Sequence, residues 1–260
     1  MFSATMPSIA DNLTNWDDAR NWQQDGDEWS HSWGSSAALW HGTILPRIAA
    51  CLPAGDMLEI ACGHGRVTQY LLGHCVRYRG VDLAPSCVSI CTQRFAGRSG
   101  ASFERTDGST LPGIAAASID FACSWDSLVH AELDAVGGYV RELGRVLRPG
   151  GTAFLHHSTM LDHVDANGQL TVPNPHWRAT SVSAAIVQAR AIASGLQCVT
   201  QELVQWGSTT YSDCFTLLRR QDDTRVAECE THVLRHPAFH EELAHLQRLD
   251  RAYRQSLRLQ

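Results

Sequence analysis

The stretch that decides the fold is Met57-Leu58-Glu59-Ile60-Ala61-Cys62-Gly63-His64-Gly65, followed by Asp82 within Gly80-Val81-Asp82-Leu83. An apolar run that ends in a glycine-rich turn is typical of a strand leading to a small-molecule site, because glycine lets backbone N–H groups approach a ligand closely. A helix predicted from Val67 to Leu72 would direct its positive N-terminal end at that ligand. Asp82 is suited to hold the two vicinal hydroxyls of a ribose. The pattern indicates a pocket for a nucleoside-type cofactor.

The spacing of the glycines separates two classes of cofactor. A dinucleotide site needs Gly-x-Gly-x-x-Gly, but Gly63-His64-Gly65 is followed by Arg66-Val67-Thr68, which lacks the third glycine. Glu59 can instead position a cationic group such as an amino-acid ammonium. The arrangement Glu-x-Ala-Cys-Gly-x-Gly plus Asp82 resembles the signature of class I S-adenosylmethionine-dependent methyltransferases of the bacterial small-molecule or sugar type. The resemblance extends through roughly residues 45 to 220.

Strand and helix patterns alternate from Asp56 onward, which predicts an α/β domain with a parallel sheet. Together with the resemblance to the methyltransferase family, this alternation leads us to expect a Rossmann-like, mostly parallel sheet of seven strands. Helices would cover both faces, and the last two strands would form an antiparallel pair. The predicted strands are 57–61, 76–81, 101–106, 119–124, 152–157, 198–206 and 211–219. The predicted helices are 65–73, 85–95, 133–147 and 180–194, and a charged amphipathic helix at 237–259.

Three segments are expected along the chain. Residues 1–44 form an N-terminal aromatic-rich cover, 45–220 the cofactor-binding core with an acceptor-side insertion at 158–180, and 221–260 a C-terminal helical segment. Five tryptophans punctuate the cover, and their packing onto the core would close it over the cofactor. Tryptophan faces also suit stacking on sugar rings or enclosing a sulfonium cation.

Bulk composition excludes several classes of protein. With 44% apolar and 18% charged residues the chain is globular, and its net charge of −6 argues against a nucleic-acid partner. No apolar stretch approaches the roughly 20 residues of a membrane span, and residues 1–10 show no secretory signal. Nine scattered cysteines fit a reduced, cytoplasmic core. The composition leaves the oligomeric state open, and a homodimer is one alternative.

The resemblance implies one cofactor contact at the end of each successive strand. Leu83 would flank the adenine, and Asp107-Gly108 matches the acidic position that meets the adenine amino group, although Asp-Gly is also a common turn. The junction Arg148-Pro149-Gly150-Gly151 belongs to the same pattern. The implied cofactor-binding residues are Glu59, Ala61, Gly63, Gly65, Arg66, Asp82, Leu83, Asp107, Gly108 and Ser124.

The acceptor side has fewer signals. Methyl transfer to a hydroxyl requires alignment and a base, and histidine suits this role at neutral pH. We expect His157, near the end of its strand, to be that base and Asp126 to orient a histidine. His130 is either a further catalytic residue or a structural one. The residues predicted to contact the acceptor are Trp125, His156, His176, Trp177 and Arg178.

The sequence therefore predicts transfer of a methyl group from S-adenosylmethionine to a hydroxylated small molecule, sugar or glycan in natural-product or cell-surface biosynthesis. S-adenosylhomocysteine would be released. An N-methyltransferase of a small molecule and a non-catalytic, cofactor-binding partner protein are the alternatives. No metal is expected, because the histidine-rich pool Asp126, His156, His157, Asp162, His163 and His176 lacks the paired carboxylates that hard ions prefer.

Overall fold

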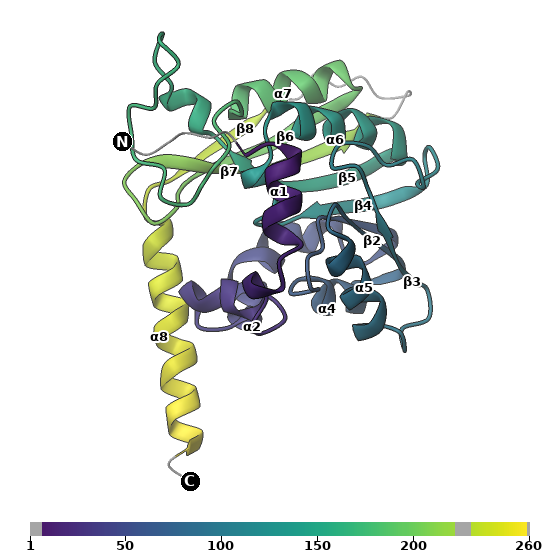
Figure 1. Ribbon diagram of the computed structural model, residues 1–260, viewed down its shortest axis with the longest axis vertical. Coiled ribbons are helices and arrows are strands. Elements are labelled where there is room, and N and C mark those ends of the chain that lie inside the picture. Colours follow the sequence, from purple (N-terminus) through teal and green to yellow (C-terminus); the bar gives the residue numbers. More distant parts are fainter. Residues whose placement is uncertain (1–6, 222–229, 259–260) are drawn as a thin grey trace.

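The computed structural model describes residues 7–221 and 230–258, and a single sheet of eight strands forms its centre (Figure 1). The strand order is β3-β2-β1-β4-β5-β7-β6-β8. The strands are β1 Ala54–Ile60, β2 Cys75–Asp82, β3 Ala101–Arg105, β4 Ile119–Ser124, β5 Leu147–Ser158, β6 Leu196–Gln205, β7 Tyr211–Arg220 and β8 His232–His236. The sheet is mostly parallel, because only β7 runs antiparallel to its neighbours β5 and β6.

The expected α/β fold and the antiparallel β6–β7 pair are confirmed, but the expected count of seven strands is one too low. The additional strand, β8, pairs in parallel with β6, so that Leu203 lies opposite Arg235. Its sequence His-Val-Leu-Arg-His is short, and all but its last residue are exposed at the edge of the sheet. The region after residue 221, expected to be helical, therefore also contributes a strand.

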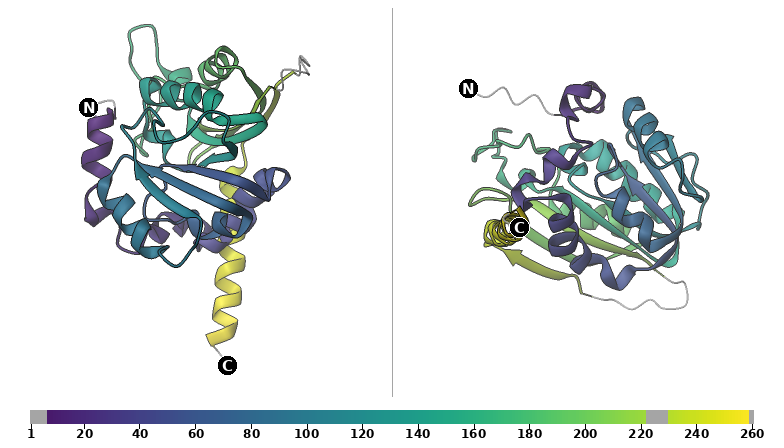
Figure 2. Two further views of the ribbon diagram at one scale, coloured as in Figure 1. Left: turned by 90° about the vertical axis from the view of Figure 1, so that its right-hand side faces the viewer. Right: turned by 90° about the horizontal axis from the view of Figure 1, so that it is seen from below.

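Helices cover both faces of the sheet (Figures 1 and 2). One face carries α6 Leu133–Val146 and α7 Ala184–Ala193. The other carries the short helices α2 Ser36–Leu39, α3 Leu45–Ile48 and α4 Thr68–Leu71, with a π-helical turn at Trp40–Ile44 between α2 and α3. The remaining helices are α1 Ile9–Trp16, α5 Pro85–Arg94 beside β2 and β3, and α8 Phe239–Arg258.

Side chains that alternate along the strands divide the interior into two cores. In β4, Ala122 faces the aliphatic core under α6 and α7, whereas Phe121 and Cys123 face the aromatic core under the N-terminal segment. Burial of these apolar side chains is the main force that holds the layers together. The helix predicted at 65–73 is shorter than expected, because α4 ends at Leu71 and a 3₁₀ turn follows.

Strand β1 pairs with β2 on one side and with β4 on the other, so the order of the strands reverses there. In open α/β sheets such a switch point leaves a crevice at the carboxyl ends of the strands, where ligands bind. The glycine turn that follows β1 lies at this position. Among the described residues, no helix is long and apolar enough to cross a membrane.

Candidate functional site

The turn after β1 is held by the carboxylate at the end of β2. Gly63 has a φ of 56°, and its N–H donates to Asp82 Oδ2 at 2.8 Å. Asp82 Oδ1 accepts the N–H of Ala84 at 2.9 Å. Asp82 is 6% exposed, and burial raises the pKa of its carboxyl. Each carboxylate oxygen keeps a further acceptor position, which fits two vicinal hydroxyls.

Glu59 lies behind this turn and is almost fully buried. Its Oε2 accepts the hydroxyl of Thr68 at 2.6 Å and that of Tyr78. Burial raises the pKa of Glu59 to about 7, although the two hydrogen bonds oppose that change. A carboxyl with this pKa responds to a nearby cation, because the cation favours its ionised form.

A cavity of about 530 Å³ lies above the carboxyl ends of β1, β2 and β4, and residues of the N-terminal segment contribute to its wall. The chain has eight tryptophans, and seven of them line this cavity. They come from segments far apart in the sequence: Trp16, Trp22, Trp29, Trp33, Trp125, Trp177 and Trp206. The wall is therefore unusually rich in indole surface.

The N-terminal segment contacts the glycine turn directly. The Trp22 ring stacks on His64 with centroids 4.4 Å apart, and its indole N–H donates to the Trp16 carbonyl at 2.8 Å. A Cβ at Gly63 would come within 2.7 Å of Trp22. Asn12 Nδ2 donates to the backbone carbonyl of His130 at 2.8 Å. Glycine at position 63 thus permits both the turn and its contact with Trp22.

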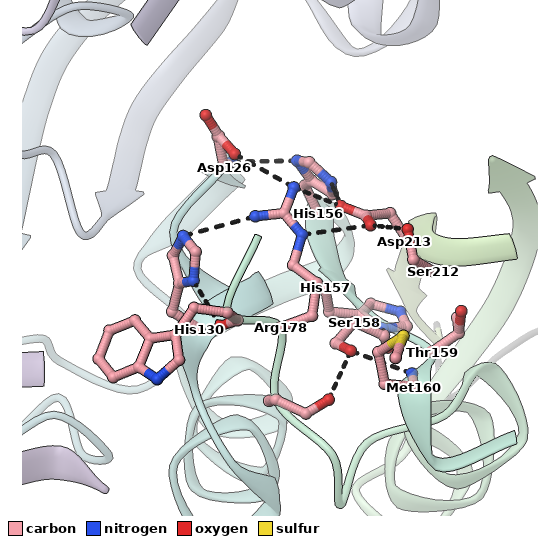
Figure 3. A network of polar contacts seen from close by, with 12 residues as sticks. Asp126, His130, His156, His157, Ser158, Thr159, Met160, Arg178, Ser212 and Asp213 are labelled. Atoms are coloured by element: carbon pink, nitrogen blue, oxygen red, sulfur yellow. Dashed lines mark hydrogen bonds and ion pairs between the residues drawn. The ribbon is translucent and has the colours of Figure 1, made fainter. Parts of the chain in front are cut away.

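Asp126, two residues after β4, begins a buried polar network (Figure 3). Its φ is 55°, and its N–H donates to His156 Nδ1 at 3.1 Å. His156 Nε2 lies 2.8 Å from Asp213 Oδ2. Since Nδ1 accepts, the proton of the neutral ring is on Nε2 and is donated to Asp213. The carboxylate of Asp126 forms its short ion pair with Arg66, at 3.0 Å, and does not orient a histidine as expected.

Arg178, from the loop between β5 and α7, crosses this network. Its Nε donates to Asp213 Oδ1 at 3.2 Å, and its Nη2 lies 2.8 Å from Oδ2, within ion-pair distance. Burial alone would raise the pKa values of Asp213 and Asp126. Arg178 and His156 lower the pKa of Asp213, and Arg66, Arg178 and His156 lower that of Asp126. Both pKa values therefore lie below the ordinary range of an aspartate. The Arg178 guanidinium also lies 5.1 Å from the centre of the Trp206 ring.

The two histidines expected in catalysis, His157 and His130, form hydrogen bonds to other protein groups. His157 is fully buried, with Nδ1 at 2.8 Å from the Ser158 carbonyl and Nε2 at 2.8 Å from Thr216 Oγ1. It does not line the cavity, so its expected role as the base is not supported. His130 does line the cavity, but Nδ1 lies 2.9 Å from the Trp177 carbonyl, and burial lowers the pKa of the ring to about 4.

The structure brings most of the expected site residues to one cavity. Those on its wall are Glu59, Ala61, Gly63, Arg66, Asp82, Leu83, Gly108, Trp125, Asp126, His130, His176, Trp177 and Arg178. Those that do not line it are Gly65, Asp107, Ser124, His156 and His157. Asp107 caps its own turn: its carboxylate accepts the Thr110 hydroxyl at 2.7 Å, which does most to lower its pKa, and the N–H groups of Ser109 at 2.8 Å and Thr110 at 2.7 Å lower it further. The adenine contact expected of Asp107 is therefore not supported.

Two residues of the site were not among those predicted from the sequence. Asp213 is fully buried in β7 and organises Arg178 and His156. Trp206, at the end of β6, lines the cavity and packs on Arg178. A carboxylate inside the apolar strand Tyr211–Arg220 was the available signal for Asp213, because buried charges are almost always paired.

Residues 57–151 match the family described as a methyltransferase domain. The chain contains a class I, S-adenosylmethionine-dependent methyltransferase domain. No curated protein matches the chain by sequence. Among solved structures it is similar to the N-methyltransferase NodS from Bradyrhizobium japonicum WM9 in complex with S-adenosylhomocysteine, with a TM-score of 0.60 and 21% identity over 81% of this chain and 99% of NodS.

The methyltransferase is also similar to PH0226 from Pyrococcus horikoshii OT3, with a TM-score of 0.58 and 16% identity over 77% of this chain and 95% of that one. A further similar structure is the (4+2)-cyclase SpnF, with a TM-score of 0.54 and 15% identity over 72% of this chain and 82% of SpnF. At these identities the likenesses concern the fold.

The residues around the glycine turn fit the cofactor of this methyltransferase domain. Asp82 offers acceptors for ribose hydroxyls, and Leu83, Gly108 and Ile9 offer an apolar surface at the same end of the cavity. Glu59 lies deeper, where a cationic ligand group would favour its ionised form. Within residues 7–221 and 230–258, no group of three or more His, Cys, Asp or Glu side chains is arranged to hold a metal ion.

Proposed function

We propose that this methyltransferase transfers the methyl group of S-adenosylmethionine to a small molecule enclosed in the tryptophan-lined cavity. One observation carries the proposal: a single cavity is lined both by Asp82 and the glycine turn and by Trp125, Asp126 and Arg178. The cofactor supplies a methyl carbon bonded to a cationic sulfur. Asp82 and Gly63 would hold it, while residues beyond β4 would align the acceptor.

The size and cover of the cavity support a small acceptor. A volume of about 530 Å³ is within the range of roughly 300–1,000 Å³ that is common for small-molecule sites. In this proposal residues 1–44 act as the cover and residues 158–180, which include His176 and Arg178, as the acceptor-side insertion. Indole faces would suit a sugar ring, an aromatic ring or an organic cation, so the biosynthetic setting expected from the sequence depends on the acceptor.

The acceptor atom expected from the sequence, oxygen, depended on a histidine base. His157 does not line the cavity, and His130 has a pKa of about 4. His176 favours a hydroxyl acceptor as a second candidate: it lines the cavity, and burial, with Arg178 nearby, lowers its pKa, so that the ring is neutral at pH 7. A nitrogen acceptor, which in its neutral form needs no such base, is the first candidate.

Calorimetry tests the cofactor part of the proposal. We expect S-adenosylmethionine and S-adenosylhomocysteine to bind and NAD to give no heat. Asp82→Asn should weaken binding of both ligands, whereas Asp165→Asn, in an exposed turn that does not line the cavity, should not. Tight NAD binding without a response to the sulfonium cofactor would refute the proposal.

An acceptor screen tests turnover. The enzyme with S-adenosylmethionine is incubated with pooled amines and pooled alcohols and phenols, and products are sought by a mass increase of one methylene. Formation of S-adenosylhomocysteine that depends on an acceptor would support catalysis. Cofactor binding with no turnover in any pool would favour the non-catalytic alternative, a member that binds the cofactor and acts through a partner.

A further inference from the structure

We propose that the acceptor is an amine, and that its nitrogen is held between the carboxylate of Asp126 and a wall formed by Trp33, Trp125 and Trp206. The wall would bind the cationic ammonium group that methylation produces. This inference rests on the proposed function and names its acceptor class. It arises from the packing of the three tryptophans and from the balance of charge beside them.

The tryptophan wall is continuous. Trp33 ends the 3₁₀ segment Asp27–Trp33, Trp125 follows β4, and Trp206 follows β6. Their ring centroids are 5.5 Å apart for Trp33 and Trp206, and 6.3 Å apart for both pairs that include Trp125. Rings at this spacing contact each other, so no ligand fits between them. The rings are tilted by 54–68° to one another, and all three line the cavity.

The charged groups next to this wall neutralise one another. Arg66 pairs with Asp126 and Arg178 with Asp213, which gives two positive and two negative charges. Asp126 Oδ2 lies 3.0 Å from Arg66, but Oδ1 lies 3.8 Å from Arg178, beyond hydrogen-bond distance. Oδ1 therefore keeps the capacity to accept a hydrogen bond from a ligand. Arg178 already lies 5.1 Å from the centre of the Trp206 ring. The groups left for a ligand are therefore the Asp126 oxygen and the indoles of Trp33 and Trp125, a combination that suits an N–H group with alkyl substituents.

The balance of charge in the reaction separates an amine from a hydroxyl. An amine that arrives as an ammonium ion first loses a proton to water, and its lone pair then forms the new nitrogen–carbon bond as the carbon–sulfur bond breaks, with the bonding pair of that second bond left on sulfur. Positive charge thereby passes from sulfur to nitrogen, and any remaining N–H proton then leaves to water. A hydroxyl must lose its proton and ends as a neutral ether. Only the amine brings a cation to the tryptophan wall, where indole faces stabilise it as it develops.

The backbone conformation at Asp126 positions its carboxylate, and neighbouring residues hold that conformation in place. A non-glycine residue with a φ of 55° is strained and is kept only where its surroundings fix it. His156 fixes it by accepting the Asp126 N–H, and Asp213 fixes the tautomer of His156. His156 and Asp213 are therefore positioning residues for the acceptor, although neither lines the cavity.

A pair of probes of equal shape tests the inference. The enzyme saturated with S-adenosylhomocysteine is titrated with choline and with its uncharged carbon analogue 3,3-dimethylbutan-1-ol. We expect choline to bind about 10-fold more tightly, from cation–aromatic attraction and the nearby carboxylate. Asp126→Asn should reduce this ratio, since it keeps the shape and removes the charge. Equal affinities, or no choline binding, would overturn the inference.

Two tryptophans give a matched pair of variants. Trp33 and Trp40 are both almost fully buried in the N-terminal segment, at 1% and 2% exposure, but only Trp33 lines the cavity. Trp33→Phe should lower the choline preference about threefold, because phenylalanine binds cations more weakly, and Trp40→Phe should leave it unchanged. Should either variant fail to fold, enzyme in which all eight tryptophans are fluorinated provides a second measurement. Choline affinity should fall with each added fluorine, while the affinity for the carbon analogue stays constant. Equal changes in the two affinities would refute the proposal that the tryptophan wall binds the cation.

The same samples separate this inference from the proposed function. If S-adenosylhomocysteine does not bind, the proposed function fails whatever the probes do. If it binds and the probes bind equally, only the amine assignment fails. In the acceptor screen, methylated amines would support the assignment, and methylation confined to alcohols or phenols would contradict it.

Discussion

Glu59→Gln should make the protein more stable at alkaline pH, and the size of the effect follows from burial. Glu59 is 3% exposed, and burial raises its pKa from 4.5 to about 7. A carboxyl whose pKa is raised by folding favours the folded state while it is protonated. That contribution is fully present below the unfolded pKa and is lost as the pH rises through 7.

The magnitude follows from linkage. Each unit of difference between the folded and unfolded pKa corresponds to 1.36 kcal/mol, so ionising Glu59 costs about 3 kcal/mol once the pH is above 7. Between pH 5 and pH 8 the wild type should lose about 2–3 kcal/mol relative to Glu59→Gln. Glutamine keeps a carbonyl oxygen that accepts from Thr68 and Tyr78, so the hydrogen bonds survive the substitution.

Urea unfolding at pH 5, 6, 7 and 8 measures this difference. Glu142→Gln is the control, because the hydrogen bond from Arg145 lowers the pKa of Glu142, which is therefore ionised in both states across this range. The difference in free energy of unfolding between Glu142→Gln and the wild type should not change with pH. A flat difference for Glu59→Gln as well would refute the argument that burial governs this carboxyl.

Three further predictions concern the turn and the network. Asp82→Ala should weaken S-adenosylmethionine binding about 10–100-fold in calorimetry, because the ribose acceptors and the brace on the glycine turn are both lost. Gly63→Ala should lower thermal stability by about 1–3 kcal/mol, since its φ of 56° and the Trp22 ring leave no room for a Cβ. An unchanged melting temperature would contradict this. Asp213→Asn should cost about 3–5 kcal/mol in urea unfolding, as it leaves Arg178 buried without its anion, and a loss below 1 kcal/mol would show that the pair is replaceable.

The cofactor end of the site was predictable because it is local in sequence. The glycine turn and the apolar strands before Gly63 and Asp82 are signalled by residue type and spacing within about 25 residues. Most predicted strands and helices agree with the structure within a few residues for the same reason. Strand β8 is not predicted because its two apolar residues, Val233 and Leu234, are adjacent and exposed, which leaves no apolar alternation to detect.

The acceptor end was less predictable because its contacts are distant in sequence. The place of His157 near a strand end predicts a base, yet Thr216 in a different strand contacts one of its ring nitrogens. Asp126 was expected to orient a histidine through its carboxylate, whereas its backbone N–H contacts His156. Which partner a polar side chain finds depends on strand register between β5 and β7, which no local pattern contains.

The C-terminal helix supports the acceptor wall, although it extends well beyond the sheet (Figure 1). The Trp33 indole donates to Thr43 Oγ1 at 2.9 Å, and that hydroxyl donates to Glu242 of α8 at 2.6 Å. Phe239, the first residue of α8, is fully buried and stacks on Trp206 with centroids 5.4 Å apart. Contacts with α8 thus hold two of the three wall tryptophans in place before any ligand binds. Binding of an acceptor therefore does not have to offset the loss of side-chain entropy that ordering these rings would cost.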